Sequence, residues 1–287
     1  LALMEDNTVV HPPMELLFTV CEEDGMAGIR QMDMSMIRSR RMLNMDCGDP
    51  DVMCVSCAGS VHYVMRLPVA VSPAVGQAYA LRVDGLAGGH AGLLIGSGRA
   101  SAVVLMGRTL SRLCREVSCR IVSVNCEKTQ GIAPRMEAEI VLKPEQESHA
   151  RQVLAGLSAA LCEEYAATDP NLSLTLEKLN RKAEQAMDEA SSRRCTELMY
   201  LLPYGVMKYD SRDRDVILNS VNTVRVTTGN GAVEYEQMIR SPIDAYKWEL
   251  VDRLRILAEL TGAVLVVEDS YPGWPCREDS PLQQLCR

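Results

Sequence analysis

The sequence has fewer positively charged than negatively charged residues, and it has no long apolar run. Its 30 Lys and Arg residues face 38 Asp and Glu residues, a net charge of −8. Without a basic stripe, nucleic acid and an anionic membrane surface are poor candidates for its partner. No segment approaches the ~20 apolar residues of a membrane span, and the acidic first residues do not resemble a signal peptide. These absences predict a cytoplasmic protein that binds neither nucleic acid nor a membrane.

Cysteines at the spacing of a structural metal site are also scarce. Of the 11 Cys, only Cys54 and Cys57 form a C-x-x-C pair, and no second pair lies at zinc-site distance. The thiols are therefore expected to be reduced and packed. No low-complexity tract or long linker interrupts the 287 residues, and this length favours two domains with separate cores.

Two apolar runs near the start each end in carboxylates. Residues 14–20 lead to Glu22 and Glu23, and residues 42–45 lead to Asp46. Met and Ile residues at helical spacing lie between the runs, so we predict a strand, helix, strand unit with parallel strands. The carboxyl ends of such strands meet at one edge of a sheet, where three acids could bind a divalent cation and activate its water. The alternative is that these acids are solvated loop residues or helix N-terminal charges.

From residue 61 the pattern becomes that of a half-exposed antiparallel sheet, with apolar and polar residues alternating. We expect strands at residues 61–67, 77–83, 120–125, 136–142, 172–179, 216–228, 232–239 and 263–267. We expect helices at residues 98–115, 144–165, 183–202 and 244–261. The order strand, helix, strand, strand, helix within this series is typical of a ferredoxin-like, split βαβ layer. The two strands around Gly229-Asn230-Gly231 are predicted to form a hairpin.

These elements predict an α/β portion with a mostly parallel sheet and an inserted α+β domain of ferredoxin-like layers. The expected boundaries are residues 1–60, 61–271 and 272–287. Leu1-Ala2-Leu3-Met4 resembles the last turns of a helix already under way, and residues 280–287 begin a helix that is cut off. The chain is therefore expected to be an internal part of a larger protein.

The most specific local string is Asp84-Gly85-Leu86-Ala87-Gly88-Gly89-His90-Ala91-Gly92. Four glycines around one histidine allow close backbone approach and present an imidazole on a loop. The alternative is a glycine-rich hairpin with an incidental histidine.

Six strings, taken in order, resemble the aminoacyl-histidine dipeptidases, which are dizinc metallopeptidases related to aminoacylases and carboxypeptidases. The strings are residues 19–26, 44–46, 57–59, 85–92, 239–241 and 271–274. The resemblance covers nearly the whole chain. It implies a partial zinc-peptidase catalytic domain that resumes near residue 272, an inserted lid or dimerisation domain, and hydrolysis of Xaa-His-like dipeptides by zinc-activated water. It also implies two Zn²⁺ per site and a homodimer formed through the lid.

The resemblance implies roles on the metal side of the site. Glu22 matches the general base of the family, Glu23 matches a ligand of one zinc, and Asp46 matches a ligand of the other.

The resemblance implies further roles on the lid. His90 matches a histidine that stabilises the tetrahedral oxyanion, often from the partner subunit. Arg240 matches an arginine suited to holding the substrate carboxylate with two parallel hydrogen bonds. Asn222 matches an asparagine near the substrate.

The sequence also departs from the family pattern. The two zinc-binding histidines and the bridging aspartate of the family have no counterpart among His11, His62, His90, His149 and their neighbours. Gly131 stands where the family has a substrate-contacting amide. The chain alone is therefore expected to be inactive. Two alternatives stay open: a non-catalytic degenerate relative or fragment acting through lid-mediated dimerisation, and an amidase acting on acylated amino acids.

Overall fold

The structure is a computed structural model that describes residues 2–22, 25–45, 52–127 and 131–285. The chain divides into two compact units, one formed by Leu1–Val55 with Arg277–Arg287 and the other by Ser56–Cys276. The division into a catalytic domain and a lid, with the boundaries given above, stays a prediction.

The first unit contains short helices and, in its described residues, no strand. These helices are α1 (Ala2–Glu5), α2 (Ala27–Gln31), the 3₁₀ helix η1 (Met34–Met36) and α8 (Pro281–Leu285). The parallel strands predicted at residues 14–20 and 42–45 are wrong, because these residues form no strand. Nor are the apolar runs buried: Phe18 is 78% exposed and Met45 is 87% exposed. A parallel strand needs neighbouring strands and layers that cover both of its faces, and an apolar run alone does not supply them.

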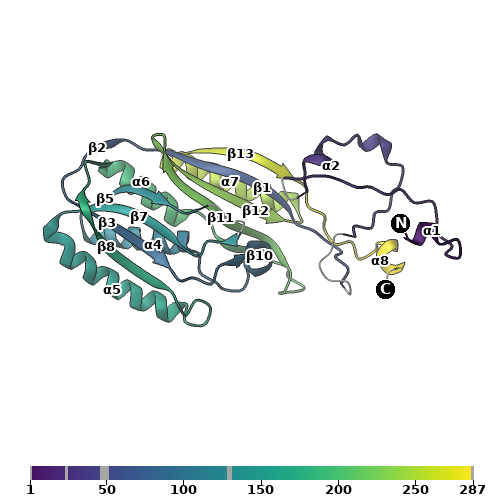
Figure 1. Cartoon of the computed structure of the whole chain (residues 1–287), viewed down its shortest axis with the longest axis horizontal. Helices are drawn as coiled ribbons and strands as arrows, with labels where there is room; N and C mark the ends of the chain where they lie inside the picture. The colour runs from purple at the N-terminus through teal and green to yellow at the C-terminus, as the bar shows by residue number, and fades with distance from the viewer. Residues whose placement is uncertain (1, 23–24, 46–51, 128–130, 286–287) are drawn as a thin grey trace. The chain divides into compact units, whose positions relative to one another are not determined.

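The second unit contains two larger sheets, and every pair of strands in them is antiparallel (Figure 1). The four-stranded sheet has the order β5-β7-β3-β8, and the five-stranded sheet has the order β10-β11-β12-β1-β13. The first consists of β3 (Gln77–Asp84), β5 (Cys119–Asn125), β7 (Met136–Leu142) and β8 (Ser173–Lys182). The second consists of β1 (Gly59–Pro68), β10 (Gly205–Tyr209), β11 (Ile217–Gly229), β12 (Ala232–Ser241) and β13 (Val264–Tyr271). The antiparallel pairing expected from residue 61 on is thus observed, whereas the mostly parallel sheet expected for the first portion of the chain is not formed by its described residues.

The four-stranded sheet follows the split βαβ order. Along the chain β3 is followed by α4 (Ala102–Glu116), β5, β7, the 3₁₀ helix η2 (Pro144–Gln146), α5 (Glu147–Glu164) and β8. This order, with β3 and β7 in the middle of the sheet, is the ferredoxin-like arrangement. Leu105, Leu110 and Leu113 lie on one buried stripe of α4, as expected for a helix that packs against a sheet.

The five-stranded sheet presents one apolar face and one polar face. Val61 lies opposite Ile239, and Met65 lies opposite Tyr235; all four are buried in the main core with α6 (Glu189–Leu201) and α7 (Asp244–Thr261). Because successive side chains alternate between faces, the intervening residues of β1 point to the other side.

Two short strand pairs complete the second unit: β2 (Val71–Pro73) with β9 (Gln185–Met187), and β4 (Gly89–His90) with β6 (Gly131–Ile132). Across the part of the chain that the structure describes, no helix has the length and apolar character needed to cross a bilayer.

Candidate functional site

The glycine-rich string forms a constrained loop that presents His90. Gly85, Gly88 and Gly89 have φ values of 77°, 59° and 116°, which side chains larger than glycine rarely adopt. A Cβ atom on Gly85 would lie 1.9 Å from the carbonyl oxygen of Asn171, so the backbone also passes very close to its neighbour. His90 ends β4 with an exposed side chain and precedes the short helix α3 (Ala91–Leu94). The glycines are therefore required by the backbone path that leads to the imidazole.

Asn222 supports the strand that pairs with His90. His90 lies opposite Gly131 in the β4–β6 pair, and the Nδ2 of Asn222 donates a 2.9 Å hydrogen bond to the Gly131 carbonyl. Asn222 is only 5% exposed, and its Oδ1 has no hydrogen-bond partner within the described part of the chain. The Asn222 side chain thus links β11 to the β4–β6 strand pair, and its Oδ1 accepts no hydrogen bond from the described residues.

His90 and Arg240 approach the same point, although 150 positions separate them in the sequence. A Cβ atom added to Gly92 would lie 2.9 Å from His90 Cε1 and 3.9 Å from Arg240 Nη1. Arg240 is half-buried on β12, opposite Ser220 of β11. Among the described residues no hydrogen bond or ion pair of Arg240 is found. The structure therefore brings together two of the predicted lid residues.

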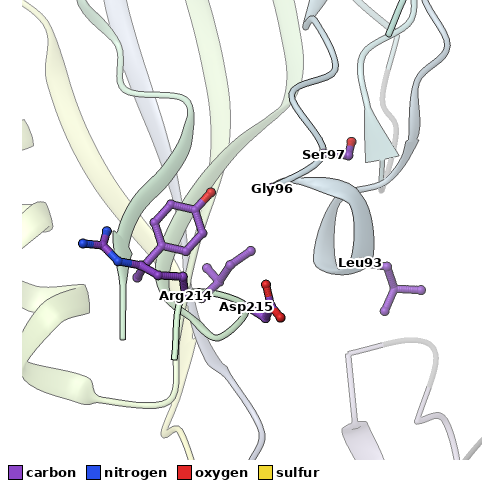
Figure 2. Close-up of a pocket in the computed structure, with 7 residues that line it drawn as sticks. Leu93, Gly96, Ser97, Arg214 and Asp215 are labelled. Carbon is purple, nitrogen blue, oxygen red and sulfur yellow. The ribbon is translucent and has the colours of Figure 1, made fainter. Parts of the chain in front are cut away.

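A cavity of about 450 Å³ opens beside the segment that follows His90 (Figure 2). Its lining residues are Leu93, Gly96, Ser97, Tyr209, Arg214, Asp215 and Ile217. Leu93, Gly96 and Ser97 come from α3 and the loop after it, whereas the remaining four come from the β10–β11 hairpin. The cavity therefore offers both apolar side chains and charges of each sign.

The metal side of the predicted site is not assembled by the described residues. Glu22 is exposed in the turn before α2, while Glu23 and Asp46 lie outside the described residues. In the described part of the chain, no three His, Cys, Asp or Glu side chains form a group that could hold a metal. The described residues therefore do not fit a zinc site by themselves.

Sequence reasoning missed a polar cluster on the polar face of the five-stranded sheet, where Glu236 is buried. His62 Nε2 lies 2.9 Å from Glu236 Oε1, and His62 Nδ1 lies 3.5 Å from Glu268 Oε2. The second carboxylate oxygen of Glu236 lies 2.9 Å from Arg225 Nε. The alternation of β1 could have placed His62 on the polar face, but its partners come from strands more than 170 positions away. Glu236 is thus paired with His62 and Arg225, and not with Arg240, which lies four positions further along β12.

The chain is similar to two known dipeptidases, one by sequence and one by structure. No protein-family profile matches the sequence. The chain is 30% identical over 291 aligned positions to the cytosol non-specific dipeptidase of Escherichia coli (strain K12), covering all of this chain and 60% of that protein. The crystal structure of aminoacylhistidine dipeptidase from Vibrio alginolyticus matches with a TM-score of 0.86 and 25% identity, over 94% of this chain and 55% of that one.

A third protein, an amidase of the hydantoinase/carbamoylase family from Burkholderia multivorans, matches with a TM-score of 0.27 and 13% identity, over 49% of this chain and 33% of that one. Such a score supports no argument. The chain spans only 60% and 55% of the length of the two dipeptidases. Within that span, the resemblance to dipeptidases is confirmed by sequence over the whole chain and by structure over 94% of it.

Proposed function

We propose that this chain is part of a dipeptide-hydrolysing enzyme, and that its second unit supplies groups that bind the substrate and stabilise the transition state. The names of the two relatives, a cytosol non-specific dipeptidase and an aminoacylhistidine dipeptidase, support this reaction class. The observation that carries the proposal is the approach of His90 and Arg240 to one point beside Gly92.

Arg240 is assigned to binding the terminal carboxylate of the dipeptide. A guanidinium presents two parallel N–H donors whose spacing matches a carboxylate, which an ammonium group cannot imitate. Arg240 is half-buried, and it keeps its donors unused among the described residues. Partial removal from water strengthens its attraction for an anion.

His90 is assigned to the chemical step. Its exposed imidazole can donate an N–H to the carbonyl oxygen of the substrate, which becomes negative as the carbon turns tetrahedral. Because that charge exists only in the transition state, the contact accelerates the reaction instead of merely tightening binding. Asn222 is assigned to the neighbourhood of the substrate, where its unused Oδ1 can accept an N–H.

Zinc would be held by Glu23 and Asp46, with Glu22 as the general base of the reaction. The described residues assemble no site for the metal. Cytoplasmic location is proposed from the name of the E. coli relative. Homodimerisation through the second unit is proposed because β13, at the edge of its sheet, exposes Val264 (54%) and Val266 (48%).

The test uses Arg240→Lys and His90→Ala in the full-length protein with dipeptide substrates. Arg240→Lys should mainly raise KM, because the two-pronged geometry is lost. His90→Ala should lower kcat by roughly 10²-fold or more, as loss of one oxyanion donor does. Arg66→Lys is a matched control on the same sheet, since Arg66 forms an exposed pair with Glu234.

Three outcomes would count against the proposal. Lower melting temperatures with unchanged kinetic constants would give both residues a purely structural role. Turnover of acylated amino acids but not of dipeptides would favour the amidase, and no turnover of either would favour the non-catalytic protein.

A further inference from the structure

A single buried carboxylate ties together the two ends of the segment that carries His90. Asp169 lies in the turn between α5 and β8 and is 1% exposed. Its Oδ1 accepts a 2.8 Å hydrogen bond from the backbone N–H of Ala87, and its Oδ2 accepts a 2.9 Å bond from the backbone N–H of Ala100. Ala87 precedes His90 and Ala100 follows it, so residues 87–100, here called the His90 segment, are closed by one side chain.

The His90 segment needs such support because its own backbone is conformationally costly. Gly88, Gly89 and Gly98 all have positive φ, and glycine loses more conformational freedom on folding than any other residue. Inside the segment, Arg99 Nη1 donates a 2.7 Å hydrogen bond to the Gly88 carbonyl. This bond links the two ends of the segment to each other, whereas Asp169 links both ends to the turn between α5 and β8.

A carboxylate suits this position better than its amide would. Both donors are backbone N–H groups, and a carboxylate accepts with both oxygens. An asparagine would accept with one atom and turn its own N–H₂ toward the other donor. A buried charge is tolerated only when hydrogen bonds compensate for the loss of water, and here each oxygen has such a bond.

Asp169 is also anchored firmly in its own turn. Its backbone N–H donates to the Tyr165 carbonyl at 2.8 Å, and its carbonyl accepts from Leu172 N–H at 3.0 Å. The carboxylate is therefore held by the end of α5 and the start of β8, so its position is set by the four-stranded layer.

We propose that Asp169 is a positioning residue for His90, which fixes the imidazole by holding both ends of the His90 segment on the four-stranded layer. The proposal rests on the catalytic role given to His90 above. Asp169 makes no contact with substrate in this role; it acts through the backbone of Ala87 and Ala100.

The first measurement is hydrogen–deuterium exchange in the present chain. Asp169→Asn should speed exchange of the backbone amides in residues 87–100. The asparagine NH₂ group would face the backbone N–H of Ala87 or Ala100, so one of the two hydrogen bonds is lost. Asp188→Ala is the matched control: Asp188 also accepts from a backbone N–H, that of Ser191 at 2.7 Å, but it caps α6. The control should leave exchange of the His90 segment unchanged. Equal exchange of the segment in wild type and Asp169→Asn would overturn the proposal.

The second measurement is a double-mutant cycle in the full-length protein. Asp169→Asn should lower kcat by roughly 10- to 100-fold with little change in KM, as small displacements of a catalytic group do. When His90 is already alanine, Asp169→Asn should cause no further loss, because the two residues act as one unit. A positioning role would be refuted if the loss of kcat in the double variant were the product of the two single losses. It would also be refuted if Asp188→Ala lowered kcat as much as Asp169→Asn does.

Two further arms keep the outcomes separate. If Asp169→Asn does not fold, Asp169→Glu keeps the charge but moves the carboxylate by one methylene, and it should show the same loosening and the same fall in kcat. If His90→Ala leaves kcat unchanged, the function proposed for His90 fails. Faster exchange would then show that Asp169 holds the segment, and unchanged exchange would refute that as well.

Discussion

Asn219 and Asn222 stand three positions apart on β11, and each donates from Nδ2 to a backbone carbonyl at 2.9 Å. Both are 5% exposed. They differ in what they hold: Asn219 bonds to Tyr246 of α7, whereas Asn222 bonds to Gly131 of β6. The sheet therefore contains a natural matched pair, one member of which supports the strand beside His90.

Asn222→Ala and Asn219→Ala are expected to have similar effects on stability and different effects on the site. Each removes one part-buried hydrogen bond to a backbone carbonyl, so each should lower the free energy of unfolding by about 0.5–1.5 kcal/mol in urea titrations. Only Asn222→Ala should speed hydrogen exchange at residues 89–90 and 131–132. Equal exchange at these residues in the two variants would show that Asn222 gives the β4–β6 pair no special support.

Gly92→Ala is expected to disturb the site while preserving the fold. Gly92 lies in α3, whose backbone accepts alanine, but the new Cβ would lie 2.9 Å from His90 Cε1. The imidazole must move, so kcat of the full-length protein should fall with little change in melting temperature. The control is Gly156→Ala in α5, where no atom lies within 4 Å of the new Cβ. That control should stabilise the protein by roughly 0.5–1 kcal/mol and leave kcat unchanged. An unaltered kcat in Gly92→Ala would show that the position of the His90 imidazole does not matter for the reaction.

The carboxylate of Asp244 is expected to contribute to acid unfolding. Its Oδ1 lies 2.8 Å from the Nζ of Lys247, a buried lysine that also donates to the Tyr271 carbonyl at 2.6 Å. The Lys247 hydrogen bond, followed by that of the Gly273 N–H, lowers the pKa of Asp244 below its ordinary value of 3.8. The folded state therefore binds this proton less readily than the unfolded state does.

A lowered pKa of this kind stabilises the folded state above pH 3.8, and the stabilisation is lost as pH falls through the lower pKa of the folded state. Asp244→Asn should therefore flatten the fall in unfolding free energy below pH 3.8, measured by urea titration at a series of pH values. Identical slopes for wild type and variant would show that the Lys247 contact does not contribute.

Isothermal titration of the present chain with Zn²⁺ should show no tight stoichiometric site. Glu23 and Asp46 offer carboxylate oxygens without imidazole partners, a set closer to magnesium chemistry than to zinc chemistry. For the same reason the chain alone should hydrolyse no dipeptide. A tight one-to-one or two-to-one zinc isotherm would contradict this, and His11→Ala and His62→Ala would then identify the unrecognised ligand.

The second unit could be predicted closely because its signals are local. Residues 136–142 and 244–261 have the predicted bounds, since alternation and helical spacing are strong there. The hairpin turn has positive φ at Asn230 and Gly231, and Gly262 ends α7 in the left-handed conformation, as the residue types indicate. The short strands β2 and β10 were not predicted, because three to five residues carry little periodicity. The helix predicted at residues 183–202 is wrong in its first turn, where β9 (Gln185–Met187) forms and α6 begins only at Glu189.

The site was less accessible from the sequence, for two different physical reasons. The nearness of His90 and Arg240 depends on the pairing of β4 with β6 and of β11 with β12, and no local spacing encodes such pairings. The family resemblance pointed to His90 and Arg240, but it did not predict how close the two side chains lie. At residues 14–20 and 42–45 the error was of the opposite kind: the apolar pattern was real, yet no strand pairs with these residues in the described part of the chain.

The strand order of the larger sheet also bears on how the protein is made. β1 lies between β12 and β13, so Met65 pairs with Tyr235 on one side and Leu265 on the other. Synthesis runs from the N-terminus, and β1 leaves the ribosome long before either neighbour exists. Pairings of such high contact order form slowly and leave unpaired strand edges exposed in the meantime. β1 is therefore the first strand of this sheet to be made, and its pairing is completed only after β13, the last strand, has been synthesised.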